Sequence, residues 1–76
     1  MRLRTPEQEL QRWIKGAEEA GATYMLVVCD TFDYDEYPTH VYPGDSLHEV
    51  QKKYKDSVEE IIAITDVELG ETLFKV

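Results

Sequence analysis

The sequence has one cysteine, no long apolar run and, through its middle part, no basic residue. Cys29 is the only cysteine among 76 residues. A lone cysteine excludes an intramolecular disulfide framework and favours a reducing compartment. No apolar run approaches the roughly 18 residues that a membrane-spanning helix needs, and the charged start lacks the apolar core of a signal peptide. We therefore expect a single domain over residues 1–76, located in the cytoplasm.

Basic residues are scarce and unevenly distributed. Eight Lys and Arg stand against sixteen Asp and Glu, for a net charge of −8, and none of the eight lies between Gly16 and Gln51. Nucleic acids and anionic lipids are bound through cationic faces, so direct binding to nucleic acid or to a membrane is not expected. The simplest interpretation of the acidic bias is a solvated surface that aids solubility.

Helix and strand signals alternate along the chain. Thr5 as N-cap and Pro6 at the first helical position open a helix that continues to Gly21, with Trp13 on its apolar stripe as a core residue. A capping box at Ser46 opens a second helix that ends near Asp56. Strands are predicted over 23–30, 37–43 and 58–65. Residues 66–76 fit either a short helix or a hairpin with a fourth strand, and Gly70 together with Thr, Phe and Val favours the hairpin.

This order predicts an α/β (α+β) fold, a small two-layer sandwich of helix, strand, strand, helix and strand. The strand over 37–43 is bracketed by prolines, which suits an edge. We expect a mixed sheet in the order 2-1-3, with the first strand antiparallel to both neighbours and the helices mainly on one face. Because the first and third strands are apolar on both faces, the uncovered face predicts a homodimer.

The candidate binding site directly follows the first strand, where the buried run Tyr24–Cys29 gives way to acids and aromatics. A rigid strand that ends in such a loop fixes its side chains for recognition. The predicted binding residues are Asp30, Thr31, Phe32, Asp33, Tyr34, Asp35, Glu36, Tyr37 and Tyr42.

No catalytic residue, metal or cofactor is predicted. The loop acids lack the alternate spacing and the glycine of an EF-hand, because Phe32 and Tyr34 occupy the flexible positions. A catalytic pair with Cys29 as nucleophile and His40 as its base is disfavoured, because neighbouring acids raise the pKa of a thiol and the strand around Cys29 is apolar. A non-enzymatic protein is expected.

The segment Leu26–Tyr34, followed by an acid, Tyr37-Pro38 and a short strand, resembles a segment of small acidic proteins encoded by bacteriophages and prophages. The resemblance spans residues 21–50 and supplies no catalytic residue. It implies a protein that acts in the cytoplasm of an infected bacterium, where small viral proteins often antagonise host or defence machinery by binding.

Two functions remain open from the sequence. In the first, the acidic-aromatic loop engages a basic surface of a host protein, such as a nucleic-acid-binding or defence protein, with the aromatics as buried anchors. In the second, Phe32, Tyr34, Tyr37 and Tyr42 line a pocket, at the loop or at a dimer interface, for a small flat ligand such as a nucleotide.

Overall fold

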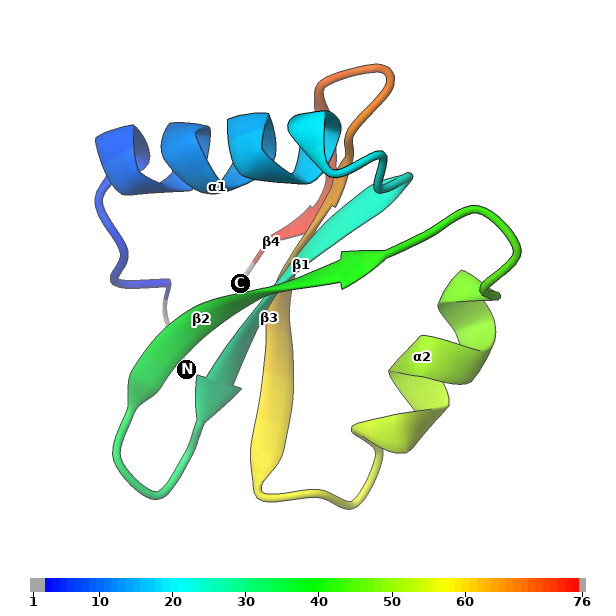
Figure 1. Ribbon diagram of the computed structural model, residues 1–76. Coiled ribbons are helices and arrows are strands. Elements are labelled where there is room, and N and C mark those ends of the chain that lie inside the picture. The colour runs from blue at the N-terminus through cyan, green and yellow to red at the C-terminus, as the bar shows by residue number, and fades with distance from the viewer. Residues whose placement is uncertain (1–2, 76) are drawn as a thin grey trace.

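One four-stranded sheet runs through the molecule, with a helix on each side, in a computed structural model that describes residues 3–75 (Figure 1). The elements in chain order are α1 (Glu7–Glu19), β1 (Tyr24–Asp30), β2 (Asp35–Val41), α2 (Leu47–Lys53), β3 (Glu59–Asp66) and β4 (Glu71–Lys75). Neither helix in that part of the chain has both the length and the apolarity to cross a bilayer.

The strand order is β2-β1-β3-β4, which confirms the predicted order 2-1-3 and adds β4 beside β3. The hairpin prediction for the last residues is also confirmed, with Gly70 at a positive φ of 68° in the turn. Because β1 separates β2 from β3, every neighbouring pair is antiparallel and the sheet is not mixed. Val76, predicted as part of the fourth strand, lies outside the described residues.

The two helices lie on opposite faces of the sheet, so the prediction that they share one face is wrong (Figure 1). Leu10 and Ala17 of α1 pack against Met25, Val27 and Cys29 of β1. The alternate residues of β1 point to the other face, where α2 covers them. A strand that is apolar on both faces needs a cover on each, and this chain supplies one helix to each face.

The cover that α2 provides is partial. Its inward side chains Leu47 and Val50, together with Tyr54, pack against Leu26 and Val28, yet no α2 residue is fully buried. The homodimer was predicted because one sheet face was expected to lack a cover. Each face has a helix, so no whole sheet face is left for a second copy to cover.

Of the two predicted helix N-caps, one is confirmed and the other is wrong. Ser46 caps α2 as predicted, because its side-chain oxygen accepts a hydrogen bond from the backbone N–H of Glu49. Thr5 was predicted to cap the first helix, but the N-cap is Pro6, which makes no side-chain cap bond. The Thr5 hydroxyl instead donates to Glu36, so a contact distant in sequence replaces the local one.

Candidate functional site

The β1–β2 hairpin carries most of the predicted site at one end of the sheet. Asp30 and Asp35 are the last opposing pair of the ladder, so the connecting loop is residues 31–34. The Tyr34 N–H donates to the carbonyl of Asp30 at 2.6 Å, and the Phe32 N–H donates to an Asp30 carboxylate oxygen at 2.8 Å. These two hydrogen bonds hold the loop against Asp30 at the end of β1. The side chains of residues 32–34 therefore project away from the sheet into solvent.

The aromatic residues of the loop face solvent. The side chain of Phe32 is 81% exposed and that of Tyr34 is 54% exposed, although both residues are bulky and apolar. Asp33 and Asp35 beside them are also exposed. We call Phe32, Asp33, Tyr34 and Asp35 the hairpin tip.

Tyr34 has an unusual backbone conformation. Its φ of 62° lies in the left-handed region, which costs a residue with a Cβ on the order of 1 kcal/mol. Asp56 is the other non-glycine residue with a positive φ among residues 3–75, and aspartate tolerates this region better. A large aromatic side chain is therefore retained at a position where glycine or asparagine would be less strained.

Glu36 belongs to the scaffold. Its carboxylate accepts hydrogen bonds from the backbone N–H groups of Arg4 and Thr5, and also from the Thr5 hydroxyl. These bonds hold the segment before α1 against the start of β2. The predicted binding residue Glu36 thus has its acceptor capacity occupied by the chain itself.

Tyr37 is likewise held in place. It is half-buried against the core on the α2 face, and its hydroxyl donates to the carboxylate of Glu59. Burial, followed by the bond to Glu59 and the charge of that group, raises the pKa of Tyr37 well above its usual value. Asp30, Glu36 and Tyr37 together form what we call the hairpin base.

The sheet brings further acids beside the hairpin. Asp30 of β1 lies opposite both Asp35 and Glu59, and in the next row Cys29 lies opposite both Glu36 and Glu60. Like charges directly opposite one another in a sheet are destabilising by roughly 0.2–1 kcal/mol per pair. We call the following set the acidic end of the molecule: Asp30, Asp33, Asp35, Glu36, Glu59 and Glu60.

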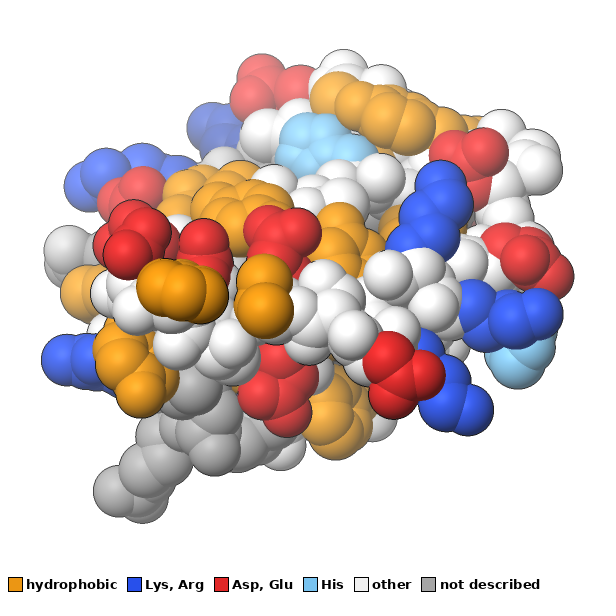
Figure 2. Space-filling view, turned by 90° about the horizontal axis from the view of Figure 1, so that it is seen from below, with side chains coloured by type: hydrophobic (Ala, Val, Ile, Leu, Met, Phe, Trp, Pro, Cys, Tyr) orange, Lys and Arg blue, Asp and Glu red, His pale blue; other side chains and the backbone are white. Residues whose placement is uncertain are grey.

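Within residues 3–75 the acidic end makes no salt bridge, and Arg4 is the cation that lines the same depression as Asp35 and Glu36. The ion pair found among residues 3–75 joins Arg12 to Glu9 at the surface of α1. No carboxylate of the acidic end has a Lys or Arg of these residues at salt-bridge distance. Figure 2 shows acidic and hydrophobic side chains side by side on this underside of the molecule, with Lys and Arg side chains at both sides of the view.

Sequence reasoning missed Val58 and the first residues of β3, Glu59 and Glu60. Val58 is 57% exposed, and its carbonyl accepts hydrogen bonds from the N–H and hydroxyl of Thr31. Val58 therefore lies beside the loop and extends its exposed apolar surface. The available signal was the antiparallel relation of the first and third strands, which predicts that Val58, Glu59 and Glu60 meet the end of the first strand.

Tyr42 is not brought together with the other predicted site residues. It follows Val41, which pairs with Tyr24 at the end of the sheet remote from the loop. Its hydroxyl lies 3.2 Å from Nδ1 of His40, and the two rings meet edge to face. The predicted binding residues consequently divide into the exposed hairpin tip, the bonded hairpin base with Thr31, and the remote Tyr42.

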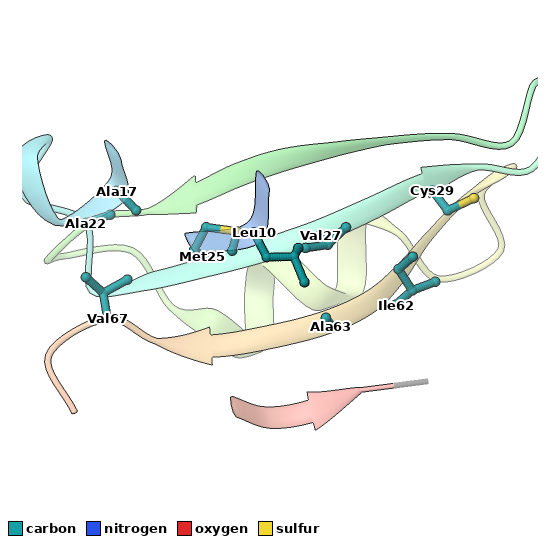
Figure 3. Close-up of a cluster of buried hydrophobic side chains, with 9 residues drawn as sticks. All are labelled: Leu10, Ala17, Ala22, Met25, Val27, Cys29, Ile62, Ala63 and Val67. Atoms are coloured by element: carbon teal, nitrogen blue, oxygen red, sulfur yellow. The ribbon is translucent and has the colours of Figure 1, made fainter. Parts of the chain in front are cut away.

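Cys29 and His40 do not meet either. Cys29 lies opposite Glu36, whereas His40 lies opposite Met25, four residues away along β1. Figure 3 shows Cys29 near Ile62 at one end of the buried cluster to which Leu10 and Ala17 of α1 also belong. Burial, and then the charges of Glu36, Glu60 and Asp30, raise the pKa of the thiol, which disfavours the thiolate. Within residues 3–75 no group of three or more His, Cys, Asp and Glu is arranged to hold a metal ion.

An open depression adjoins the hairpin tip. It has a volume of about 300 Å³ and is lined by Arg4, Thr5, Pro6, Glu9, Trp13, Tyr34, Asp35 and Glu36. Trp13 is half-buried and packs on the core, as predicted for a residue of the apolar stripe, while it also reaches this depression. Among the four aromatics expected to line a ligand pocket, Tyr34 alone borders it.

Comparison with protein-family models, with curated proteins and with solved structures found no match. The resemblance of residues 21–50 to small bacteriophage proteins stays a prediction. Function is therefore inferred from the geometry and charge of the acidic end.

Proposed function

We propose that this chain is a small non-enzymatic binding protein whose hairpin tip engages a basic surface of another protein. The observation that carries the proposal is the pair of exposed aromatics, Phe32 and Tyr34, set among carboxylates that have no cationic partner in residues 3–75. Aromatic anchors contribute most of the binding energy of such interfaces, and surrounding charges steer and orient the complex.

Two energetically unfavourable features at this end of the molecule support the proposal. Tyr34 occupies a left-handed backbone position, and acids oppose one another at Asp30–Asp35 and Asp30–Glu59. Neither feature stabilises the isolated fold. A cationic partner relieves the repulsion between the acids, and the backbone at Tyr34 holds that aromatic side chain in solvent. Local strain and like-charge repulsion of this kind are typical of functional surfaces.

The partner that best fits this chemistry is a protein with exposed Lys or Arg, such as one that ordinarily binds nucleic acid. The resemblance to bacteriophage and prophage proteins implies a bacterial host. In that case the partner is a host protein, for example one of the host's defence proteins. The pocket for a small flat ligand has less support, because Tyr37 is bonded in the scaffold and Tyr42 lies at the other end of the sheet.

The test is capture from nuclease-treated bacterial lysate with matched variants. We compare the natural protein with Asp33→Asn/Asp35→Asn at the tip and with Glu68→Gln/Glu71→Gln in the β3–β4 hairpin. Both double variants raise the net charge by two, and all four acids are exposed. A third variant, Phe32→Ala, removes the most exposed aromatic.

We expect one partner to be retained by the natural protein and by the Glu68/Glu71 variant, and to be lost with added salt, with the Asp33/Asp35 variant and with Phe32→Ala. A partner that binds all four proteins equally would show that the tip is not the interface. A rise in melting temperature with nucleotides, without a captured protein, would support the ligand pocket instead.

A further inference from the structure

A groove remains on the sheet face that α2 covers only in part. Its lining is apolar at the floor, with Ile61 and Ile64 of β3 beside Tyr54 and Phe74, and it has a volume of about 340 Å³. Phe74 is 45% exposed although it is a large aromatic residue. We call the following set the lysine-rimmed groove: Gln51, Tyr54, Lys55, Ile61, Ile64 and Phe74.

Lys55 lines this groove, and Lys52 lines the depression that adjoins it. Lys52, Lys53 and Lys55 are three of the eight Lys and Arg in the sequence, and all three are exposed. A second depression, which Lys52 lines together with His48, shares Gln51 and Lys55 with the groove. Within residues 3–75 none of these lysines has an acid at salt-bridge distance.

We infer that the lysine-rimmed groove binds the hairpin tip of a second copy of this chain. The tip offers what the groove lacks: Phe32 and Tyr34 for the apolar floor, and Asp33 and Asp35 for the lysines. The β1–β2 connection that carries the tip and the helix α2 that carries Lys52 lie apart in the fold, so a tip can reach the groove of another copy (Figure 1). An acidic tip and a lysine-lined groove carried by the same chain form two equivalent contacts when two copies meet across a twofold axis.

The strand edges are less suited to self-association. β2 forms one edge and contains Pro38, which has no N–H to donate. β4 forms the other edge, and its register with β3 shifts so that Leu73 is an extra residue between the paired Thr72 and Phe74. Prolines and bulges on edge strands prevent regular pairing with another chain.

This inference concerns the purified chain alone and does not depend on the host partner proposed above. The two are linked in one respect, since a tip bound in the groove of a second copy is unavailable to another protein. Self-association would then compete with partner binding. The experiment below contains no second protein, so it can fail while the proposed function stands, and the reverse also holds.

The test is a charge exchange between tip and groove. One variant, Asp33→Lys/Asp35→Lys, has a basic tip, and the other, Lys52→Glu/Lys55→Glu, has an acidic groove rim. Alone, each variant opposes like charges at both contacts of a dimer. When the two are mixed, one contact joins the basic tip to the acidic rim and the other contact is the natural one. A control, Lys15→Glu/Lys75→Glu, makes the same charge change as the Lys52/Lys55 variant. Lys15 belongs to α1, and Lys75 lines a depression with Leu10 and Ile14 of α1.

Sedimentation equilibrium and light scattering provide the readout. We expect the natural protein and the Lys15/Lys75 control to associate, each exchange variant alone to associate about tenfold or more weakly, and the equimolar mixture to recover association. Circular dichroism checks folding, and the single exchanges Asp35→Lys and Lys55→Glu replace any double variant that does not fold. A natural protein that stays monomeric, or a mixture as weak as its components, would overturn the inference.

Discussion

The base and the tip of the β1–β2 hairpin are made of the same residue types but differ in how they are used. In the base, Glu36 accepts bonds from Arg4 and Thr5, and Tyr37 donates to Glu59. In the tip, Asp35 and Tyr34 are exposed, and no hydrogen bond of their side chains is found within residues 3–75. Adjacent residues such as Asp35 and Glu36 therefore divide into one that is available for a partner and one that holds the fold.

The difference shows that an acidic-aromatic composition does not by itself mark a binding surface. A carboxylate whose acceptor sites are filled by backbone N–H groups contributes to stability and is poorly available to a partner. The availability of each side chain has to be determined residue by residue. Changes in the base are expected to alter stability, and changes in the tip to alter binding.

The largest effect is expected at Glu36. The change Glu36→Ala leaves the N–H groups of Arg4 and Thr5 without their acceptor, and we expect a loss of about 2 kcal/mol in the free energy of unfolding. The matched change Asp35→Ala removes the neighbouring acid, and its effect should stay within about 0.5 kcal/mol. Urea denaturation measures both. Equal losses at the two positions would contradict the division between base and tip.

A smaller effect, dependent on pH, is expected at Tyr37. Its pKa is raised in the folded state, so the protonated phenol stabilises the fold. That contribution is fully present below the ordinary tyrosine pKa of about 10 and is lost as the pH rises above it. The change Tyr37→Phe costs about 1 kcal/mol at neutral pH through the lost hydrogen bond.

The measurement for Tyr37 is the urea midpoint between pH 7 and pH 11. The natural protein should lose stability above pH 10 more steeply than the Tyr37→Phe variant, so the two curves should converge. Lysine deprotonation affects both proteins alike. Parallel curves across the range would show that Tyr37 ionises as freely in the folded chain as in the unfolded one.

The smallest effect on stability, and one of opposite sign, is expected at Tyr34. The change Tyr34→Gly removes a Cβ from a left-handed position, so stability should hold or rise by up to about 1 kcal/mol while partner capture is lost. Asp56→Gly is the matched control, because aspartate tolerates the same conformation and should gain less. A Tyr34→Gly protein that is strongly destabilised would place Tyr34 with the base.

Much of the fold was predictable because its signals are local. The apolar run of β1, the Ser46 cap and the prolines beside an edge strand depend on residues within a few positions of one another. They led to the correct strand order and to the fourth strand. The helix faces were predicted wrongly, because the sequence shows that α2 has one apolar side but does not show which sheet face that side meets.

The exposed loop was predictable in position, but the contacts of each of its side chains were not. The change from the apolar residues of β1 to acids and aromatics correctly indicated an exposed hairpin with Phe32 and Tyr34 in solvent. The bonds of Glu36 to Thr5, and of Tyr37 to Glu59, join residues more than twenty positions apart. Nothing in the loop itself distinguishes these two residues from their exposed neighbours.

The sequence by itself determined where the chain forms strands and helices, that β1 is buried on both faces and that acids and aromatics follow it. Hydrophobic periodicity and capping are properties of short segments, so they can be read without coordinates. Only the tertiary structure decided which helix covers which face, which acids are engaged by backbone N–H groups and where a groove remains beside the lysines. These outcomes depend on the register between strands and on how distant segments pack, and such relations are absent from any single segment.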